Sequence, residues 1–128
     1  MFKGTPLGNV RGLGSAHSGA HHWLLERLSG VLALLPAVFL LVSLILLPDL
    51  RFATVRGWIA EPLPALAIAA LLLTSLWHNR LGLRVLIEDY VHTPGNRVAT
   101  FLLLDVATWA AGLFGLYCLV RLALGGDA

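Results

Sequence analysis

Apolar residues gather in three segments of the chain, which are separated by charged or proline-marked breaks. The first segment, Leu28 to Leu47, holds twenty residues without a charge. A helix of that length, rising 1.5 Å per residue, crosses the ~30 Å hydrocarbon core of a bilayer. Pro36 is expected to bend this helix rather than end it, because lipid offers the backbone no other hydrogen-bond partners. Pro48 and Asp49 then stop the helix.

The second apolar segment is too short to cross a membrane by itself. From Leu63 only about fourteen uncharged residues pass before His78, so the helix must continue through a polar stretch to about Val91. Before it, residues 49–64 mix charged and aromatic groups with small apolar ones, which is typical of a connector at the headgroup level. A turn signal at 93–96 precedes a third helix, whose single intramembrane charge is Asp105.

This pattern predicts an all-α integral membrane protein with three transmembrane helices. The expected helices cover about 22–47, 63–91 and 97–124, and residues 1–128 form one membrane domain with a mobile arm over about 1–20. The composition agrees, because 58% hydrophobic and 12% charged residues give more apolar surface than one small soluble core can bury. The first twenty residues contain no apolar run ending in a cleavage site, so no removable signal is expected.

Charge and cysteine content exclude several classes of site. The net charge is +2, but the nine Lys and Arg residues form no patch, so nucleic-acid binding is not expected. The single Cys118 supports neither a disulfide framework nor a zinc knuckle, and we interpret it as a packing residue.

The basic residues predict the orientation in the membrane. Six lie at the N-terminal side or in the 80–97 region, against three on the other side: Lys3, Arg11, Arg27, Arg80, Arg84 and Arg97 against Arg51, Arg56 and Arg121. Cytoplasmic loops carry the excess of Lys and Arg. The N-terminus is therefore expected in the cytoplasm.

The polar half of the second helix carries two stripes at about 100° per residue. One stripe holds Arg80, Arg84 and Glu88, and the other holds His78, Gly82, Val85 and Asp89. His78 comes eleven residues before Asp89, about 16 Å along a helix, so it lies near mid-membrane when Asp89 and Tyr90 reach the surface. Polar groups at that depth are costly and usually mark a site.

Two interpretations of His78 remain open on spacing alone. A neutral imidazole can ligate haem iron, and Gly82 on the same face leaves room for a flat macrocycle. Alternatively, His78 forms a hydrogen bond to a neighbouring helix. Tyr90 is similarly either part of a site or an interfacial anchor.

The order His, three residues, Gly, six residues, Asp-Tyr (His78, Gly82, Asp89 and Tyr90) resembles the second helix of a known family. That family is the small membrane-anchor subunit of succinate dehydrogenase, respiratory complex II. The run RVLIEDYVH is similar to its alphaproteobacterial and mitochondrial form. HHWLLERLSG resembles the His-x5-Arg pattern ahead of the family's first helix, and ATVRGWIAEP resembles its first connector.

The resemblance implies half of a haem site. His78 would match the axial ligand of the haem b iron, and the other ligand would come from the second membrane anchor of the complex. Arg27 and His21 would match groups that meet the haem propionates, in agreement with the bidentate pairing of guanidinium with carboxylate. His22 is adjacent to His21, so which of the two faces inward stays open.

The resemblance also implies a role in ubiquinone reduction. Tyr90 would match a tyrosine whose hydroxyl binds a quinone carbonyl oxygen, with Asp89 beside it. The chain would be non-catalytic alone. It would carry electrons from succinate to ubiquinone together with the second membrane anchor, the iron–sulfur subunit and, through the latter, the flavoprotein subunit. It would lie in the inner (cytoplasmic) membrane and belong to the tricarboxylic acid cycle and electron transport.

Two features depart from the family pattern. Arg84 stands where many relatives have glutamine, and Asp105 has no role that the resemblance supplies. Arg80 and Arg84 can each pair with a nearby acidic residue. Arg84 could alternatively touch a haem propionate, but we expect it to pair with Asp105. Two alternatives are kept: the anchor of a fumarate reductase, and a small proton-coupled transporter in which Asp105 carries the proton.

Overall fold

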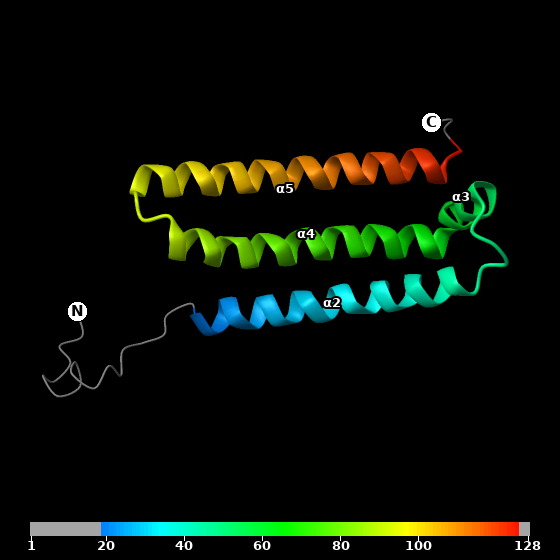
Figure 1. Ribbon diagram of the computed structural model, residues 1–128, viewed down its shortest axis with the longest axis horizontal. Coiled ribbons are helices and arrows are strands. Elements are labelled where there is room, and N and C mark those ends of the chain that lie inside the picture. Colours follow the sequence, from blue (N-terminus) through cyan, green and yellow to red (C-terminus); the bar gives the residue numbers. More distant parts are fainter. Residues whose placement is uncertain (1–18, 126–128) are drawn as a thin grey trace, which may run out of the picture.

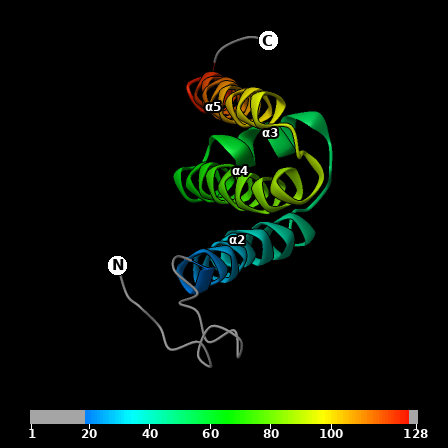
Figure 2. The same ribbon diagram turned by 90° about the vertical axis from the view of Figure 1, so that its left-hand side faces the viewer.

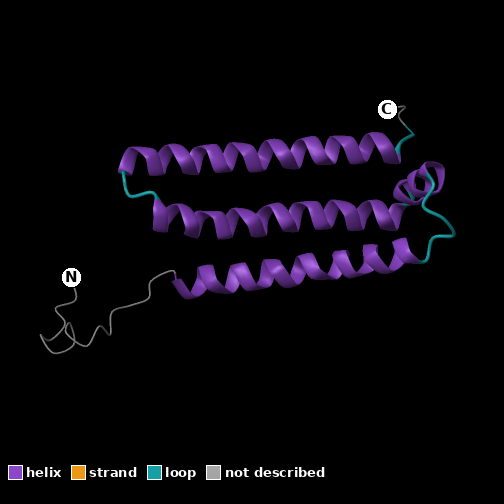
Figure 3. Ribbon diagram, viewed as in Figure 1, coloured by secondary structure: helices purple, strands orange, loops and turns teal. Residues whose placement is uncertain are grey.

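The computed structural model describes residues 19–125, and all regular structure in that range is helical. The elements are α2 (Gly19–Ile45), α3 (Phe52–Ala60), α4 (Pro62–Tyr90) and α5 (Pro94–Ala123) (Figure 3). Three of them, α2, α4 and α5, are long and apolar enough to cross a membrane. The predicted all-α fold with three membrane-spanning helices is therefore confirmed. Residues 1–18 of the expected N-terminal arm lie outside the described range, whereas Gly19 and Ala20 already belong to α2.

Prolines fall where the helices can accept them. Pro62 and Pro94 are the first residues of α4 and α5, where the backbone N–H would have no intrahelical partner. Pro36 lies inside α2, and this helix continues through it to Ile45. The prediction that Pro36 does not end the helix is thus correct.

The three long helices form a flat, antiparallel row with α4 in the middle (Figures 1 and 2). α4 contacts α2 on one side and α5 on the other, while α2 and α5 do not touch each other. A single row has almost no interior, and among the described residues the buried apolar side chains are few: Pro64, Ala67, Leu81 and Leu119. Most large apolar side chains are therefore left to contact lipid or partner helices.

α4 and α5 approach closely because α5 presents glycines to α4. A Cβ atom placed on Gly115 would lie 2.6 Å from Cδ2 of Leu72, and one placed on Gly112 would lie 3.5 Å from Cδ1 of Leu76. Small residues at helix interfaces bring backbones together in membranes, where lipid removes the hydrophobic drive for association. The leucine side chains of α4 thus occupy the space that the glycines leave open.

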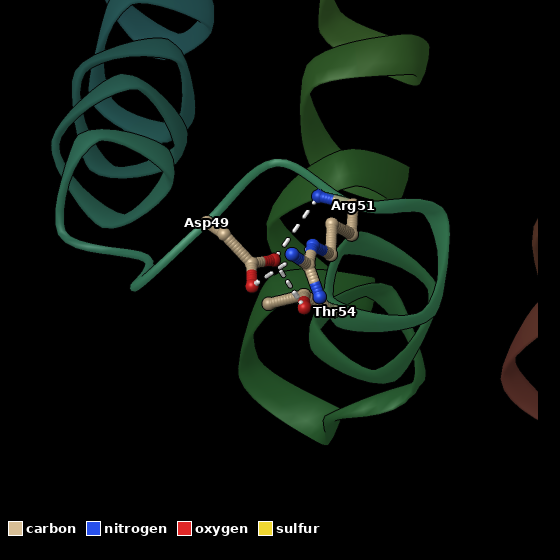
Figure 4. A network of polar contacts seen from close by, with 3 residues as sticks. All are labelled: Asp49, Arg51 and Thr54. Carbon is tan, nitrogen blue, oxygen red and sulfur yellow. Dashed lines mark hydrogen bonds and ion pairs between the residues drawn. The ribbon is translucent and has the colours of Figure 1, made fainter.

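The connector after α2 contains the short helix α3, which lies against the ends of α4 and α5. Asp49 organises the start of this helix (Figure 4). Its Oδ1 accepts hydrogen bonds from Oγ1 of Thr54 at 2.5 Å and from the backbone N–H of Arg51 at 3.1 Å. These two bonds, that from Thr54 first, lower the pKa of the Asp49 carboxyl below its ordinary value.

Candidate functional site

The polar side chains of α4 contact both neighbouring helices, α2 on one side and α5 on the other. His78 contacts Ser29 on α2, whereas Arg80 contacts Asp105 on α5. Two residues along a helix correspond to about 200° of rotation, so these side chains leave α4 on opposite sides. Because α4 lies in the middle of the row, one polar face meets each neighbouring helix.

The imidazole of His78 is held against the first turns of α2. Its Nδ1 lies 3.0 Å from Oγ of Ser29, and Oγ in turn donates a 2.8 Å hydrogen bond to the carbonyl of Glu26. Ser29 is 5% exposed. A Cβ atom on the next residue, Gly30, would lie 3.5 Å from Cε1 of His78. A serine and a glycine therefore let the ring approach the α2 backbone.

An open groove of about 490 Å³ runs along α2 beside this imidazole. Its lining is one helical stripe of α2 together with His78 from α4: Trp23, Glu26, Arg27, Gly30, Val31, Leu34 and His78. The guanidinium of Arg27 lies over the ring of Trp23, with Cζ 5.4 Å from the ring centroid. The groove thus combines an imidazole, the cation of Arg27, the carboxylate of Glu26 and an apolar wall from two helices.

This donor set fits a haem better than a bare metal ion. Within residues 19–125 no group of three or more His, Cys, Asp or Glu residues could hold a metal ion. Haem iron, in contrast, needs only axial ligands from protein, and a single imidazole can supply one of them. The apolar wall suits a macrocycle, and the Arg27 guanidinium suits a carboxylate.

The structure separates the predicted propionate-binding residues. Arg27 and His21 are both exposed, but only Arg27 lines the same groove as His78. His21 comes six residues before Arg27, about 9 Å along α2. The side chain of His22 lies outside what the structure describes.

At Gly82 an added Cβ would meet nothing within 4 Å, so the space that the sequence suggested beside this glycine is open.

Asp89 and Tyr90 lie at the end of α4, far from the imidazole. Both side chains are exposed, Tyr90 to 77%. Twelve residues separate Tyr90 from His78, about 18 Å along the helix. The two predicted quinone residues are therefore adjacent to each other but separate from the groove.

The acidic residue of α5 pairs with a different arginine from the one expected. Nε of Arg80 donates a 2.7 Å hydrogen bond to Oδ1 of Asp105. Arg84 lies over the ring of Phe101, with Cζ 5.2 Å from the centroid, and its buried Nε has no hydrogen-bond partner among residues 19–125. The predicted Arg84–Asp105 pair is wrong because Arg80 and Asp105 lie equally far from the α4–α5 turn, as do Arg84 and Phe101.

Sequence reasoning missed Ser29 and the carbonyl of Glu26. The adjacent small pair Ser29–Gly30, one turn after a charged segment, was the available signal of a close approach by another helix. The sequence alone does not show which helix approaches this pair. The antiparallel arrangement of α2 and α4 identifies it, because it places Ser29 beside His78.

Comparison with known proteins assigns the chain to a family. Residues 1–116 match the model of the succinate dehydrogenase/fumarate reductase transmembrane subunit. The succinate dehydrogenase hydrophobic membrane anchor subunit of Paracoccus denitrificans is 31% identical over 122 residues, which are 94% of this chain and 93% of the relative. That of Rickettsia conorii is 32% identical over 108 residues, 79% of this chain and 86% of the relative. The chain therefore belongs to the succinate dehydrogenase/fumarate reductase transmembrane subunits, as a hydrophobic membrane anchor of the succinate dehydrogenase type.

Proposed function

We propose that this membrane anchor supplies His78 as one axial ligand of haem b and contributes Tyr90 and Asp89 to the site where ubiquinone is reduced. The observation that carries the haem assignment is the groove in which His78 of α4 and Arg27 of α2 meet. These residues are far apart in the sequence, and the antiparallel packing of the two helices brings them to one surface.

The positions along the helices support the roles of these two residues. Gly30 lies beside His78, and Arg27 is three residues earlier in α2, about 4.5 Å nearer to the membrane end that carries Tyr90. Arg27 would therefore pair with a propionate above the level of the ligand. A bound haem b would supply one-electron transfer at its iron. His78 would hold that iron, and the apolar wall would exclude water from it.

This chain offers only one side of the haem site. The groove is open, and the described residues provide no second histidine on it. A second ligand from the other membrane anchor of the complex fits this arrangement. The exposed apolar side chains of α2 around the groove, including Val31 and Leu34, would be covered by that second anchor or by haem.

Tyr90 would donate a hydrogen bond from its hydroxyl to a carbonyl oxygen of ubiquinone. The bond would strengthen as the oxygen gains negative charge, so it would favour reduction rather than mere binding. Asp89 lies next to Tyr90, and both are exposed. Asp89 would hold or deliver a proton at the membrane surface.

Replacement of Tyr90 tests the quinone role. In the purified complex, Tyr90→Phe should slow reduction of ubiquinone while oxidation of succinate by an artificial acceptor stays near normal. Tyr117→Phe, which removes the hydroxyl of an exposed tyrosine in α5, is the matched control. Equal loss of both activities in Tyr90→Phe would refute the assignment.

Replacement of His78 tests the haem role through the haem content and spectrum of the complex.

We place the N-terminus in the cytoplasm and the chain in the inner (cytoplasmic) membrane. The start of α2 and the α4–α5 turn lie at the same end of the row (Figure 1). The sequence-based count of basic residues, six against three, favours the cytoplasm for that end. The iron–sulfur subunit would dock at this end, next to Tyr90, and the flavoprotein subunit would lie beyond it. A C-terminal reporter fusion that is active only in the cytoplasm should therefore be inactive.

The ion pair of Asp105 argues against the transporter alternative. An intramembrane carboxylate that carries protons must exchange them with water, whereas Asp105 is engaged by Arg80 at 2.7 Å. The pair instead neutralises two charges between α4 and α5.

A further inference from the structure

We infer that Ser29 is the positioning residue of His78: it holds the imidazole in the tautomer that keeps the proton on Nδ1 and leaves the lone pair of Nε2 for iron. This inference rests on the proposed haem role of His78. It adds a residue on a different helix that determines whether the histidine is able to ligate.

Oγ of Ser29 has two partners but only one hydrogen to share between them. A serine hydroxyl donates once and accepts through its lone pairs. Its hydrogen is directed to the carbonyl of Glu26 at 2.8 Å. Oγ also lies 3.0 Å from Nδ1 of His78, and with its only hydrogen engaged it acts there as an acceptor. A neutral imidazole that keeps this contact while Ser29 donates to Glu26 carries its proton on Nδ1 and leaves the lone pair on Nε2.

The burial of Ser29 favours one tautomer of His78 over the other. Ser29 is 5% exposed, so water does not readily replace either partner, and a buried polar group without a partner would be costly. The opposite tautomer would turn the lone pair of Nδ1 toward Oγ and force Ser29 to release the Glu26 carbonyl. The observed pair of bonds therefore favours one tautomer over the other.

Gly30, the residue after Ser29, packs against the same imidazole ring of His78. A Cβ atom at this position would lie 3.5 Å from Cε1 and 3.8 Å from Nδ1 of His78. The Nδ1–Cε1 edge thus packs against the backbone of α2, which limits rotation of the ring. Hydrogen bonds to the second nitrogen of a ligating histidine set its orientation and tune the metal, and their loss typically weakens metal binding roughly 10- to 100-fold.

The experiment compares Ser29→Ala and Ser29→Thr in the purified complex. Three quantities are measured: the rate of haem transfer to excess apomyoglobin, the midpoint potential of the haem, and its electron paramagnetic resonance signature. Ser29→Ala should speed haem loss roughly 10- to 100-fold and raise the potential, because an acceptor on Nδ1–H makes the imidazole a stronger donor to oxidised iron. Ser29→Thr keeps a hydroxyl and should restore all three values toward the parent.

Ser43→Ala is the matched control, since Oγ of Ser43 in the same helix donates only to the carbonyl of Leu40. If Ser29→Ala leaves all three quantities at parental values while His78→Ala alters them, Ser29 does not position the ligand and the proposed haem role survives. If His78→Ala alters nothing, the proposed haem role itself fails. If Ser29→Thr behaves like Ser29→Ala, the hydroxyl is not the active feature and the inference is overturned.

Discussion

Nε of Arg80 donates a 2.7 Å hydrogen bond to Oδ1 of Asp105, and this ion pair ties α4 to α5 between two apolar helix segments. The side chains of Arg80 and Asp105 are 17% and 31% exposed. The pair is therefore largely removed from solvent even without its membrane and partner subunits.

Breaking one side of this pair should destabilise the complex more than removing both sides. Asp105→Asn leaves Arg80 charged and poorly paired, which costs roughly 3–5 kcal/mol in fully buried pairs and less where exposure remains. The thermal unfolding midpoint of the purified complex should fall for Asp105→Asn and recover in the double variant Arg80→Leu with Asp105→Leu. A double variant as unstable as the single one would contradict this explanation.

Enlarging Gly115 should separate α4 from α5. Its Cβ atom would meet Leu72 at 2.6 Å, which the flexible end of that leucine can relieve for Ala but not for Leu. Overpacking of this kind costs roughly 1–3 kcal/mol, so Gly115→Leu should lower the thermal midpoint more than Gly115→Ala. Gly95→Ala, where an added Cβ meets nothing within 4 Å, is the control and should show no loss. Recovery of Gly115→Leu by Leu72→Ala would identify the contact.

The start of α3 should lose stability in acid. Hydrogen bonds from Thr54 and the Arg51 backbone lower the pKa of Asp49 in the folded chain below 3.8. A group whose folded pKa is depressed stabilises the fold above its unfolded pKa and loses that effect as the pH falls through the folded value. Hydrogen exchange of α3 should therefore differ between parent and Asp49→Asn by a constant amount from pH 7 to about pH 5. The difference should shrink below pH 3.8, and a difference that persists unchanged there would disprove the assignment.

Arg27 should influence the haem more strongly than His21. Arg27 lines the groove beside His78, whereas His21 is not among the residues that line it. Removing a cation that pairs with a propionate should lower the midpoint potential of the haem in Arg27→Gln, because the cation favours the reduced, less positive iron. Potentiometric titration of both variants provides the measurement. A larger shift in His21→Ala than in Arg27→Gln would reverse the order that the groove implies.

The sequence predicted the membrane helices because apolar length is a local property of the chain. It also identified His78 and Arg80 on separate stripes of one helix, and the structure directs them to α2 and α5. The choice of Arg80 over Arg84 as the partner of Asp105 depended instead on the register of the α4–α5 hairpin, which no local pattern encodes.

The hydrophobic pattern could not predict that the three long helices form a flat row either. In a membrane the lipid-facing and protein-facing sides of a helix are both apolar, so periodicity does not show which helix lies in the middle. The role of Ser29 depends on that arrangement, because its contact, His78, comes 49 positions later in the chain.

The most direct test of the haem assignment is the reduced-minus-oxidised spectrum and the haem content of the purified complex carrying His78→Ala. Asn79→Ala, which alters the exposed neighbour of His78 on α4, is the matched control and should keep the parental spectrum and haem content. We expect His78→Ala either to lose haem b or to retain it with a changed spectrum that shows altered axial ligation. Parental haem content together with an unchanged spectrum in His78→Ala would contradict the assignment and leave His78 as a histidine that merely joins α4 to α2.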